Sequence, residues 1–179
     1  MGQWKDDVKY GTTMEQLVCN ELNLRIPHWK VESWGGKDQP DFKCTIGYGE
    51  IKSYNDWYRQ PMIEYSNMTT NKKSVWVDDT TINIMVVNHG EWLHLYNASK
   101  MRYCCANGHF SWHYKDVKQG DLDQWKKMKF LHVNKSSTLR DSRHIEDTDP
   151  QRWDCSHLDD RINPYITSIR KDWTSIEKK

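Results

Sequence analysis

The chain has 179 residues, 26 basic and 25 acidic side chains, a net charge of +1 and 36% hydrophobic residues. This length fits one domain or one domain plus a small appendage, and it can bury a core without disulfides or a structural metal. The near-even charge gives no overall sign of a nucleic-acid partner. The chain has no apolar run of about 20 residues and no signal-peptide pattern, so we expect a cytoplasmic protein with no membrane association.

A helix and a strand are expected before residue 35. Thr12 or Thr13 can cap the start of the helix, and Pro27 ends it. Residues 28–34 have the composition of a strand, and Gly35-Gly36 interrupts it. The helix carries apolar residues at helical spacing: Met14, Leu17, Val18 and Leu22.

A β-hairpin is expected next. Apolar and polar residues alternate from Pro40 to Ile46, Gly47-Tyr48-Gly49 can form a turn, and Glu50-Ile51-Lys52 begins a second strand. Pro61 can then open a helix that extends to about Asn67.

Three more strands are predicted, over residues 75–77, 82–87 and 92–96. The second of them is almost continuously apolar, as a central strand should be. The order of helix, three strands, helix and two or three strands predicts an α/β fold with a mixed central sheet flanked by helices.

We assign residues 1–118 to this core and residues 119–179 to a helical and loop extension of unknown role. Asp121 can cap a helix that extends through Met128, and residues 134–160 have the composition of a long loop. Asn163-Pro164 is a good start for a final helix. Its apolar face would consist of Ile166, Ile169, Trp173 and Ile176.

The hairpin contains the residues that indicate chemistry. Side chains alternate along a strand, so Glu50 and Lys52 should share one face while Ile51 points into the core. A register that places Asp41 beside Glu50 would bring two carboxylates and one ammonium together. Oxygen-rich sites of this kind suit Mg²⁺ or Mn²⁺, and a neighbouring lysine can stabilise charge on an attacked phosphate.

The pattern of Pro-Asp, a short turn and Glu-x-Lys resembles the PD-(D/E)XK nuclease superfamily. The layout from Gly11 to Lys52 is most similar to Holliday junction resolvases and restriction endonucleases. The resemblance implies a restriction-endonuclease-like fold, with Mg²⁺ or Mn²⁺ bound by Asp41, Glu50 and the carbonyl of Ile51, and a catalytic Lys52. It also implies a metal-facing glutamate on the first helix at Glu15, for which a helix-capping role is the alternative.

Four residues after the motif are candidates for nucleic-acid contact. Arg59 or Gln60 could contact a phosphate, while Tyr54 and Trp57 could stack on bases. The alternative is that the polar pair is solvated and that the aromatic pair packs on the core.

Cysteines and histidines form a competing pattern. Five cysteines are an odd number, which favours reduced thiols over disulfides. Adjacent cysteines do not match a zinc knuckle, so we expect buried thiols rather than structural zinc. The residues concerned are Cys104, Cys105, His109, His113, Cys155 and His157.

The sequence therefore predicts a metal-dependent endonuclease that hydrolyses DNA, of junction-resolving or restriction type, with a homodimer implied by the resemblance alone. Two alternatives remain open. One is an inactive nucleic-acid-binding module of the same fold. The other is a protein-interaction or inhibitor module built on the ten tryptophans.

Overall fold

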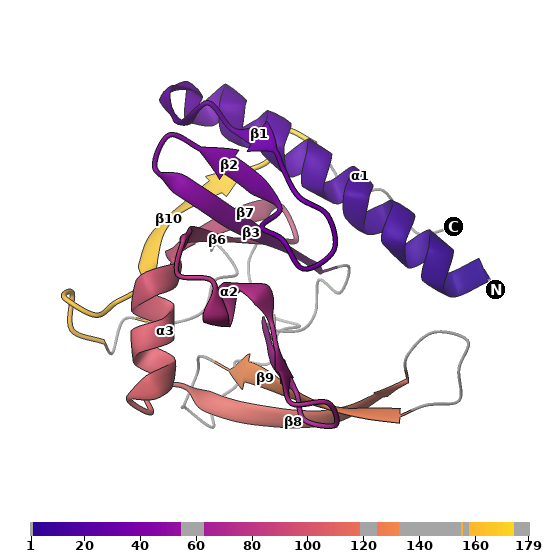
Figure 1. Cartoon of the computed structure of the whole chain (residues 1–179). Helices are drawn as coiled ribbons and strands as arrows, with labels where there is room; N and C mark the ends of the chain where they lie inside the picture. The colour runs from indigo at the N-terminus through magenta and orange to yellow at the C-terminus, as the bar shows by residue number, and fades with distance from the viewer. Residues whose placement is uncertain (1, 55–62, 119–124, 133–154, 156–157, 174–179) are drawn as a thin grey trace.

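The computed structural model describes residues 2–54, 63–118, 125–132, 155 and 158–173. These residues form three layers, which Figure 1 shows from the side. A long N-terminal helix covers one face of a six-stranded sheet, and the other face is covered by two short helices and a four-stranded sheet. The chain is thus an α/β protein built on a mixed sheet, as the sequence predicts.

The larger sheet has the spatial order β1-β2-β3-β6-β7-β10. Only β3 and β6 pair in parallel, at its centre, and the remaining neighbours are antiparallel. The strands are β1 (Glu32–Ser33), β2 (Phe42–Cys44), β3 (Gly47–Tyr54), β6 (Ile82–His89), β7 (Trp92–Asn97) and β10 (Tyr165–Arg170).

The smaller sheet is antiparallel and has the order β5-β4-β9-β8. Two of its strands lie in the segment that connects β3 to β6, and the other two form a long hairpin near the bottom of Figure 1. The strands are β4 (Ile63–Asn67), β5 (Lys72–Lys73), β8 (Ser111–Lys118) and β9 (Trp125–His132).

The N-terminal helix α1 (Gly2–Arg25) begins well before the predicted cap at Thr12 or Thr13, so both threonines lie inside it rather than at its start. Its predicted apolar stripe does face the sheet: Val18 and Leu22 are fully buried. They belong to a core cluster that also contains Phe42, Ile51, Ile84, Val86, Leu93 and Leu95. No helix in the described residues has both the length and the apolar character needed to cross a membrane.

A second core fills the space on the other face of the larger sheet. Met85 and Val87 of β6 pack there against Ile63 of β4 and against Trp76, which is fully buried. The three remaining helices are the 3-10 helix η1 (Pro27–Trp29), α2 (Val75–Asp78) and α3 (Ala98–Ala106). Of these, α2 and α3 contribute to this second core.

Three segments before residue 80 differ from the predicted type. Residues 61–67, predicted as a helix, contain strand β4, because Ile63 and Tyr65 face the second core. Residues 75–77, predicted as a strand, form α2. The predicted strand over 28–34 is a turn of η1 followed by the two-residue β1.

The predicted C-terminal helices are also wrong. From Trp125 onward the chain forms β9, and residues 165–170 form β10, which pairs with β7 at the edge of the larger sheet. Tyr165 and Ile169 pack against core residues although their spacing with Trp173 also suits a helix. Helix α3 was not predicted; its N-cap is Asn97, whose side chain accepts a hydrogen bond from the backbone N–H of Lys100.

Candidate active site

The β2–β3 hairpin sets the position of Asp41. Phe42 pairs with Gly49, and its ring fills the space where a side chain at position 49 would lie. This register places Asp41 next to Glu50, at the point where the two strands separate. The predicted hairpin is confirmed, although its turn falls at Thr45 and Ile46, because Gly47 is already part of β3.

Three hydrogen bonds fasten Asp41 to its neighbours. Its backbone N–H donates to the Gly49 carbonyl at 3.0 Å, and its carbonyl accepts from the N–H of Trp34 at 2.9 Å. Its side-chain Oδ2 accepts from the backbone N–H of Ile51 at 2.7 Å. The carboxylate is therefore held against the edge of β3 rather than left in solvent.

Glu50 and Lys52 project from β3 on the same face and form an ion pair. Lys52 Nζ donates to Glu50 Oε1 at 2.7 Å. Their neighbours in β6 are Met85 and Val87, so the pair faces the second core and the smaller sheet. Glu50 is only 5% exposed, and its other oxygen, Oε2, is buried without a hydrogen-bond partner among the described residues.

The charges of the site act on one another. Burial, followed by repulsion from Glu50, raises the pKa of Asp41 to about 7, although the hydrogen bond from Ile51 opposes the shift. Burial and Glu50 also raise the pKa of Glu15, which belongs to α1 and interacts with the site through its charge. Negative potential thus accumulates where Asp41, Glu50 and Glu15 approach one another.

Lys52 remains a cation in this environment. Burial alone would lower its pKa, but attraction to Glu50, Asp41 and Glu64 outweighs burial, and the pKa is raised. A lysine that stays protonated can donate hydrogen bonds and stabilise negative charge. It cannot take up a proton as a general base.

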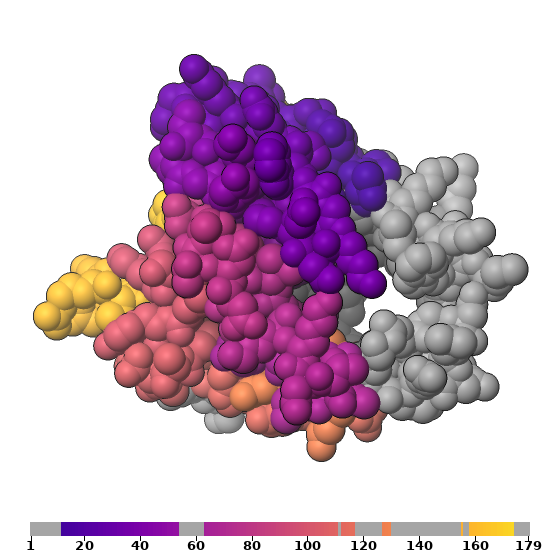
Figure 2. Space-filling model, in the orientation of Figure 1, coloured from indigo at the N-terminus to yellow at the C-terminus, as the bar shows by residue number. Residues whose placement is uncertain are grey.

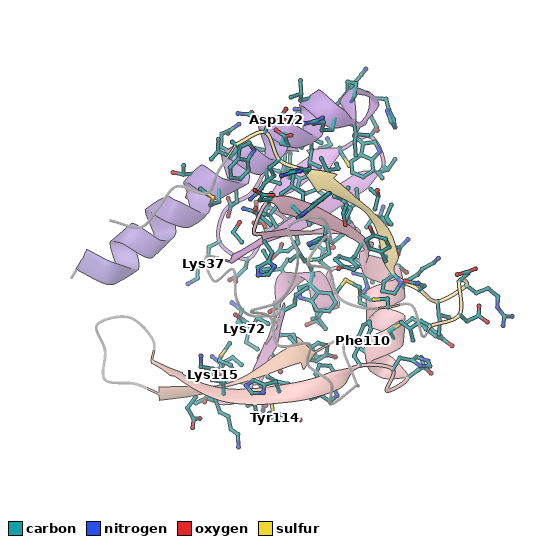
Figure 3. The ribbon with its side chains drawn as sticks, turned by 180° about the vertical axis from the view of Figure 1, so that it is seen from behind. Lys37, Lys72, Phe110, Tyr114, Lys115 and Asp172 are labelled. Atoms are coloured by element: carbon teal, nitrogen blue, oxygen red, sulfur yellow. The ribbon has the colours of Figure 1, made fainter. Side chains whose placement is uncertain are left out.

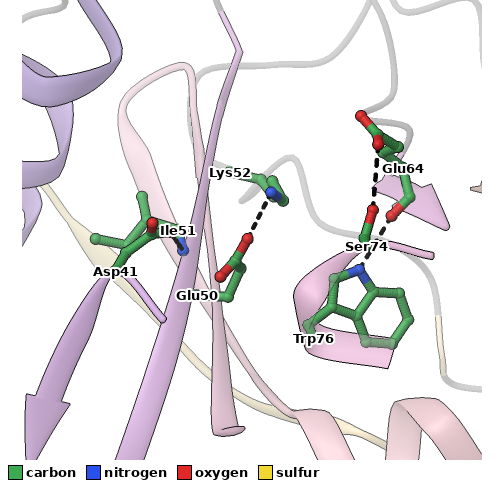
Figure 4. A network of polar contacts seen from close by, with 7 residues as sticks. All are labelled: Asp41, Glu50, Ile51, Lys52, Glu64, Ser74 and Trp76. Carbon is green, nitrogen blue, oxygen red and sulfur yellow. Dashed lines mark hydrogen bonds and ion pairs between the residues drawn. The ribbon is translucent and has the colours of Figure 1, made fainter. Parts of the chain in front are cut away.

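Glu64 of β4 is a member of the site that the sequence does not indicate. Its charge acts on Lys52 from the smaller sheet, opposite Glu50. Its carboxylate accepts from Ser74 Oγ at 3.3 Å, and its carbonyl accepts from Trp76 Nε1 at 3.0 Å, as Figure 4 shows. The sequence predicts a helix over residues 61–67. The strand β4 that forms there instead brings the charge of Glu64 close enough to act on Lys52.

The predicted convergence of Asp41, Glu50 and Lys52 is therefore met in part. Glu50 and Lys52 are in contact, while the Asp41 carboxylate accepts from the backbone N–H of Ile51 and is linked to them by charge (Figure 4). In the part of the chain that the structure describes, no three His, Cys, Asp or Glu side chains form a ready metal-binding group.

The donors present nevertheless suit a hard divalent cation. Carboxylate oxygens are the ligands that Mg²⁺ and Mn²⁺ prefer. Glu50 Oε2 is a buried carboxylate oxygen that lacks a partner among the residues the structure describes, which is costly unless a cation or a donor satisfies it. Asp41 and Glu15, whose ionisation is opposed by nearby negative charge, would also be stabilised by a bound cation.

The four residues proposed for nucleic-acid contact fall at or beyond the end of β3. Tyr54 is the last residue of that strand, whose carboxyl end lies beside His89 of β6. Trp57, Arg59 and Gln60 lie outside the described residues.

The five cysteines are all buried, as expected from the sequence. Burial, with the charges of Glu15 and Asp41, raises the pKa of Cys19 to about 11, and burial next to Cys104 raises the pKa of Cys105 to about 12. In the absence of a metal, these two thiols stay protonated at neutral pH and are poor nucleophiles. His113 is exposed on β8, and His157 is outside the described residues.

No protein-family model matches the chain, and neither a curated protein nor a solved structure matches it. What the chain can do is therefore inferred from its own geometry: a mixed α/β sheet that carries a buried, lysine-paired carboxylate at the end of a β-hairpin. The likeness to PD-(D/E)XK nucleases rests on the Asp41, Glu50 and Lys52 motif.

Proposed function

We propose that the chain is a Mg²⁺- or Mn²⁺-dependent endonuclease that hydrolyses DNA phosphodiester bonds and has a restriction-endonuclease-like core. The observation that carries the proposal is the buried Glu50 carboxylate, with one oxygen bonded to Lys52 and the other without a partner in the described structure. A homodimer able to act on both strands of a junction or a duplex is part of the proposal.

The proposed ligands are the carboxylates of Asp41 and Glu50, the carbonyl of Ile51 and, from α1, Glu15. A divalent cation held there would act as a Lewis acid on a phosphate oxygen and lower the pKa of a bound water. The protein provides anionic oxygens that are already partly desolvated, so their attraction to a cation is stronger than in water.

Lys52 would act as an electrostatic and positioning group. Its ammonium is fixed by Glu50 on one side and attracted by Glu64 on the other. Because it stays protonated, it can donate to a phosphate oxygen as negative charge develops there, or orient the attacking water. Its position is set before substrate arrives, and this preorganisation is what makes such a group effective.

A cleavage assay tests the proposal. Supercoiled plasmid and branched DNA are incubated with wild-type protein and with the Glu50→Gln and Glu32→Gln variants, with Mg²⁺ or with a chelator. Glu32 is the control, because it is an exposed glutamate on β1, which is separated from β3 by β2. We expect cleavage by wild type and by Glu32→Gln only when Mg²⁺ is present, and a loss of cleavage in Glu50→Gln. Cleavage that persists in Glu50→Gln, or no cleavage by wild type under any condition, would overturn the proposal.

A second candidate is a nucleic-acid-binding module that keeps this arrangement without cleaving. It is favoured by the lack of a three-residue ligand group in the described residues and by the internal neutralisation of Glu50 through Lys52. This candidate predicts DNA binding that is unchanged by chelator and by Glu50→Gln. As for a tryptophan-based interaction surface, Trp76 is fully buried and Trp112 packs against the second core, whereas Trp34 is exposed.

A further inference from the structure

The charge of the chain is unevenly divided between its two sheets. The four strands of the smaller sheet carry seven lysines and two acids, whereas the rest of the chain carries 19 basic and 23 acidic residues. The near-neutral total therefore hides a basic sheet attached to an acidic remainder. The seven lysines are Lys72, Lys73, Lys115, Lys118, Lys126, Lys127 and Lys129.

One face of the β8–β9 hairpin combines lysines with aromatic rings. The register pairs Tyr114 with Lys129 and Asp116 with Lys127, so these side chains share the face that carries Trp112. Lys129 Nζ lies 3.9 Å from the centre of the Trp112 ring and 5.3 Å from that of Tyr65. Tyr114 is 48% exposed and Lys127 is exposed. Asp116 on this face is exposed as well. We call Trp112, Tyr114, Asp116, Lys127 and Lys129 the cationic face.

Neither lysine of the cationic face is neutralised by an ion pair within the described residues. The ion pairs of the smaller sheet involve instead Lys72, with Asp38 at 2.7 Å, and Lys73, with Asp78 at 3.3 Å. Lys127 and Lys129 lie two positions apart on β9, and their ammonium groups are thus available to an external anion. The exposed ring of Tyr114 beside them offers a flat surface on which a base can stack.

Two links place this sheet beside the candidate active site. Lys72 of β5 forms an ion pair with Asp38, which lies in the loop that leads to Asp41. The negative charge of Glu64 on β4 attracts Lys52 and raises its pKa. On the face shown in Figure 2, the violet residues of the upper part meet the magenta residues of the β4–β5 region. Figure 3 shows Tyr114 and Lys115 on the hairpin below Lys72, and Lys37 of the same loop above it.

We propose that the cationic face binds the phosphate backbone of a nucleic acid and directs the strand toward the Glu50–Lys52 pair; the second half of this statement rests on the proposed nuclease function. A repeating polyanion fits better than a single acidic group, because two lysines that form no ion pair within the described residues, Lys127 and Lys129, follow one another along β9 beside the exposed ring of Tyr114. Phosphate contacts of this kind contribute affinity without sequence preference.

Salt-dependent binding in the presence of a chelator tests the proposal without cleavage. Fluorescence anisotropy of labelled duplex and single-stranded DNA is measured for wild type, for the double variant Lys127→Gln/Lys129→Gln and for the control Lys30→Gln/Lys100→Gln. The control removes the same charge from the residue after η1 and from α3, outside the smaller sheet. The double variant should bind about tenfold more weakly, with a salt slope smaller by about 1–2. The control should match wild type.

Lys129→Arg separates binding from folding, since arginine keeps both the charge and the ring contact. It should bind like wild type and melt at the same temperature. Equal affinity and equal salt slope in wild type and the Lys127→Gln/Lys129→Gln variant would overturn the inference, as would a wild type that binds no DNA at low salt.

The outcomes for the two proposals are distinct. If wild type binds DNA through these lysines but never cleaves with Mg²⁺, the cationic face stands and the nuclease proposal fails. If wild type cleaves, and the double variant binds and cleaves equally well, the nuclease proposal stands and the cationic face fails.

Discussion

The candidate active site on the larger sheet and the cationic face on the smaller sheet differ in how deeply their charged side chains are buried. On the larger sheet, Glu50 is buried, Asp41 is held by a backbone N–H, and each carboxylate affects the ionisation of its neighbours. On the smaller sheet, Lys127 is exposed and Lys129 lies over aromatic rings. Buried charges interact strongly and cost folding energy, whereas exposed charges cost little and contact a large ligand easily. The difference suggests that the larger sheet performs chemistry and that the smaller sheet binds.

The largest effect should come from neutralising either member of the Glu50–Lys52 ion pair. Glu50→Gln and Lys52→Gln should each lower the single-turnover cleavage rate about 100-fold or more, because each removes charge aimed at the reacting phosphate. Their affinity for DNA in chelator should change less than about twofold, since one buried group adds little to a phosphate track. A loss of affinity as large as that caused by neutralising Lys127 and Lys129 would show that the two regions are not separate.

The next largest effect should come from Gly49. A side chain at this position would collide with the Phe42 ring, so Gly49→Ala must shift β2 and, with it, Asp41. We expect a loss of about 1–3 kcal/mol in the free energy of unfolding, measured by urea denaturation. Gly36→Ala is the control, because a Cβ there meets no atom within 4 Å. Equal stability of both variants and wild type would mean that the Phe42–Gly49 contact does not fix the hairpin.

A smaller, pH-dependent effect is expected for Asp41→Asn in metal-free buffer. The folded-state pKa of Asp41 is about 7, above the usual 3.8. The unfolded chain therefore ionises this carboxyl more readily than the folded protein, and the free energy of unfolding of the wild type falls as the pH rises from about 4 to 7. Asparagine cannot ionise, and its side-chain oxygen can still accept from Ile51. The variant should therefore melt about 2–4 °C higher than wild type at pH 8, which corresponds to about 1 kcal/mol. The gap should close toward pH 4. A gap that does not change with pH would contradict the shifted pKa.

The smallest effect concerns the cationic face itself. Lys129→Gln should lower the free energy of unfolding by about 0.5–1 kcal/mol through loss of its contact with Trp112. Lys127→Gln, at an exposed position, should leave it unchanged. Chemical denaturation of both variants makes the comparison. Destabilisation by Lys127→Gln as large as that by Lys129→Gln would indicate a structural role for this face rather than a binding role.

The hairpin and its motif could be predicted because their signals are local. Alternation around Ile51 sets which side chains share a face, and Gly47 directly follows the turn at Thr45 and Ile46. The pairing of Lys52 with Glu50 follows from this spacing of two residues. The position of Asp41 at the strand edge did not follow, because it depends on how Phe42 packs over Gly49 and on the hydrogen bond from Ile51.

The smaller sheet and β10 could not be predicted, because their type is decided by distant partners. In the segment 163–176, apolar residues recur at helical spacing, yet pairing with β7 makes residues 165–170 a strand. Glu64 and Lys129 likewise acquire their neighbours only once β4 pairs with β9. Because helices were predicted over 61–67 and 121–128, neither the smaller sheet nor the cationic face could be predicted from the sequence.

The central claim is that Glu50 and Asp41 hold a divalent cation beside Lys52. The most direct test measures free Mn²⁺ by electron paramagnetic resonance during titration of wild type, Glu50→Gln, Asp41→Asn and the exposed-site control Glu32→Gln. Wild type and the control should show one saturable site, and the other two variants should bind about tenfold more weakly or worse. Equal Mn²⁺ binding by all four proteins, or none by wild type, would contradict the account.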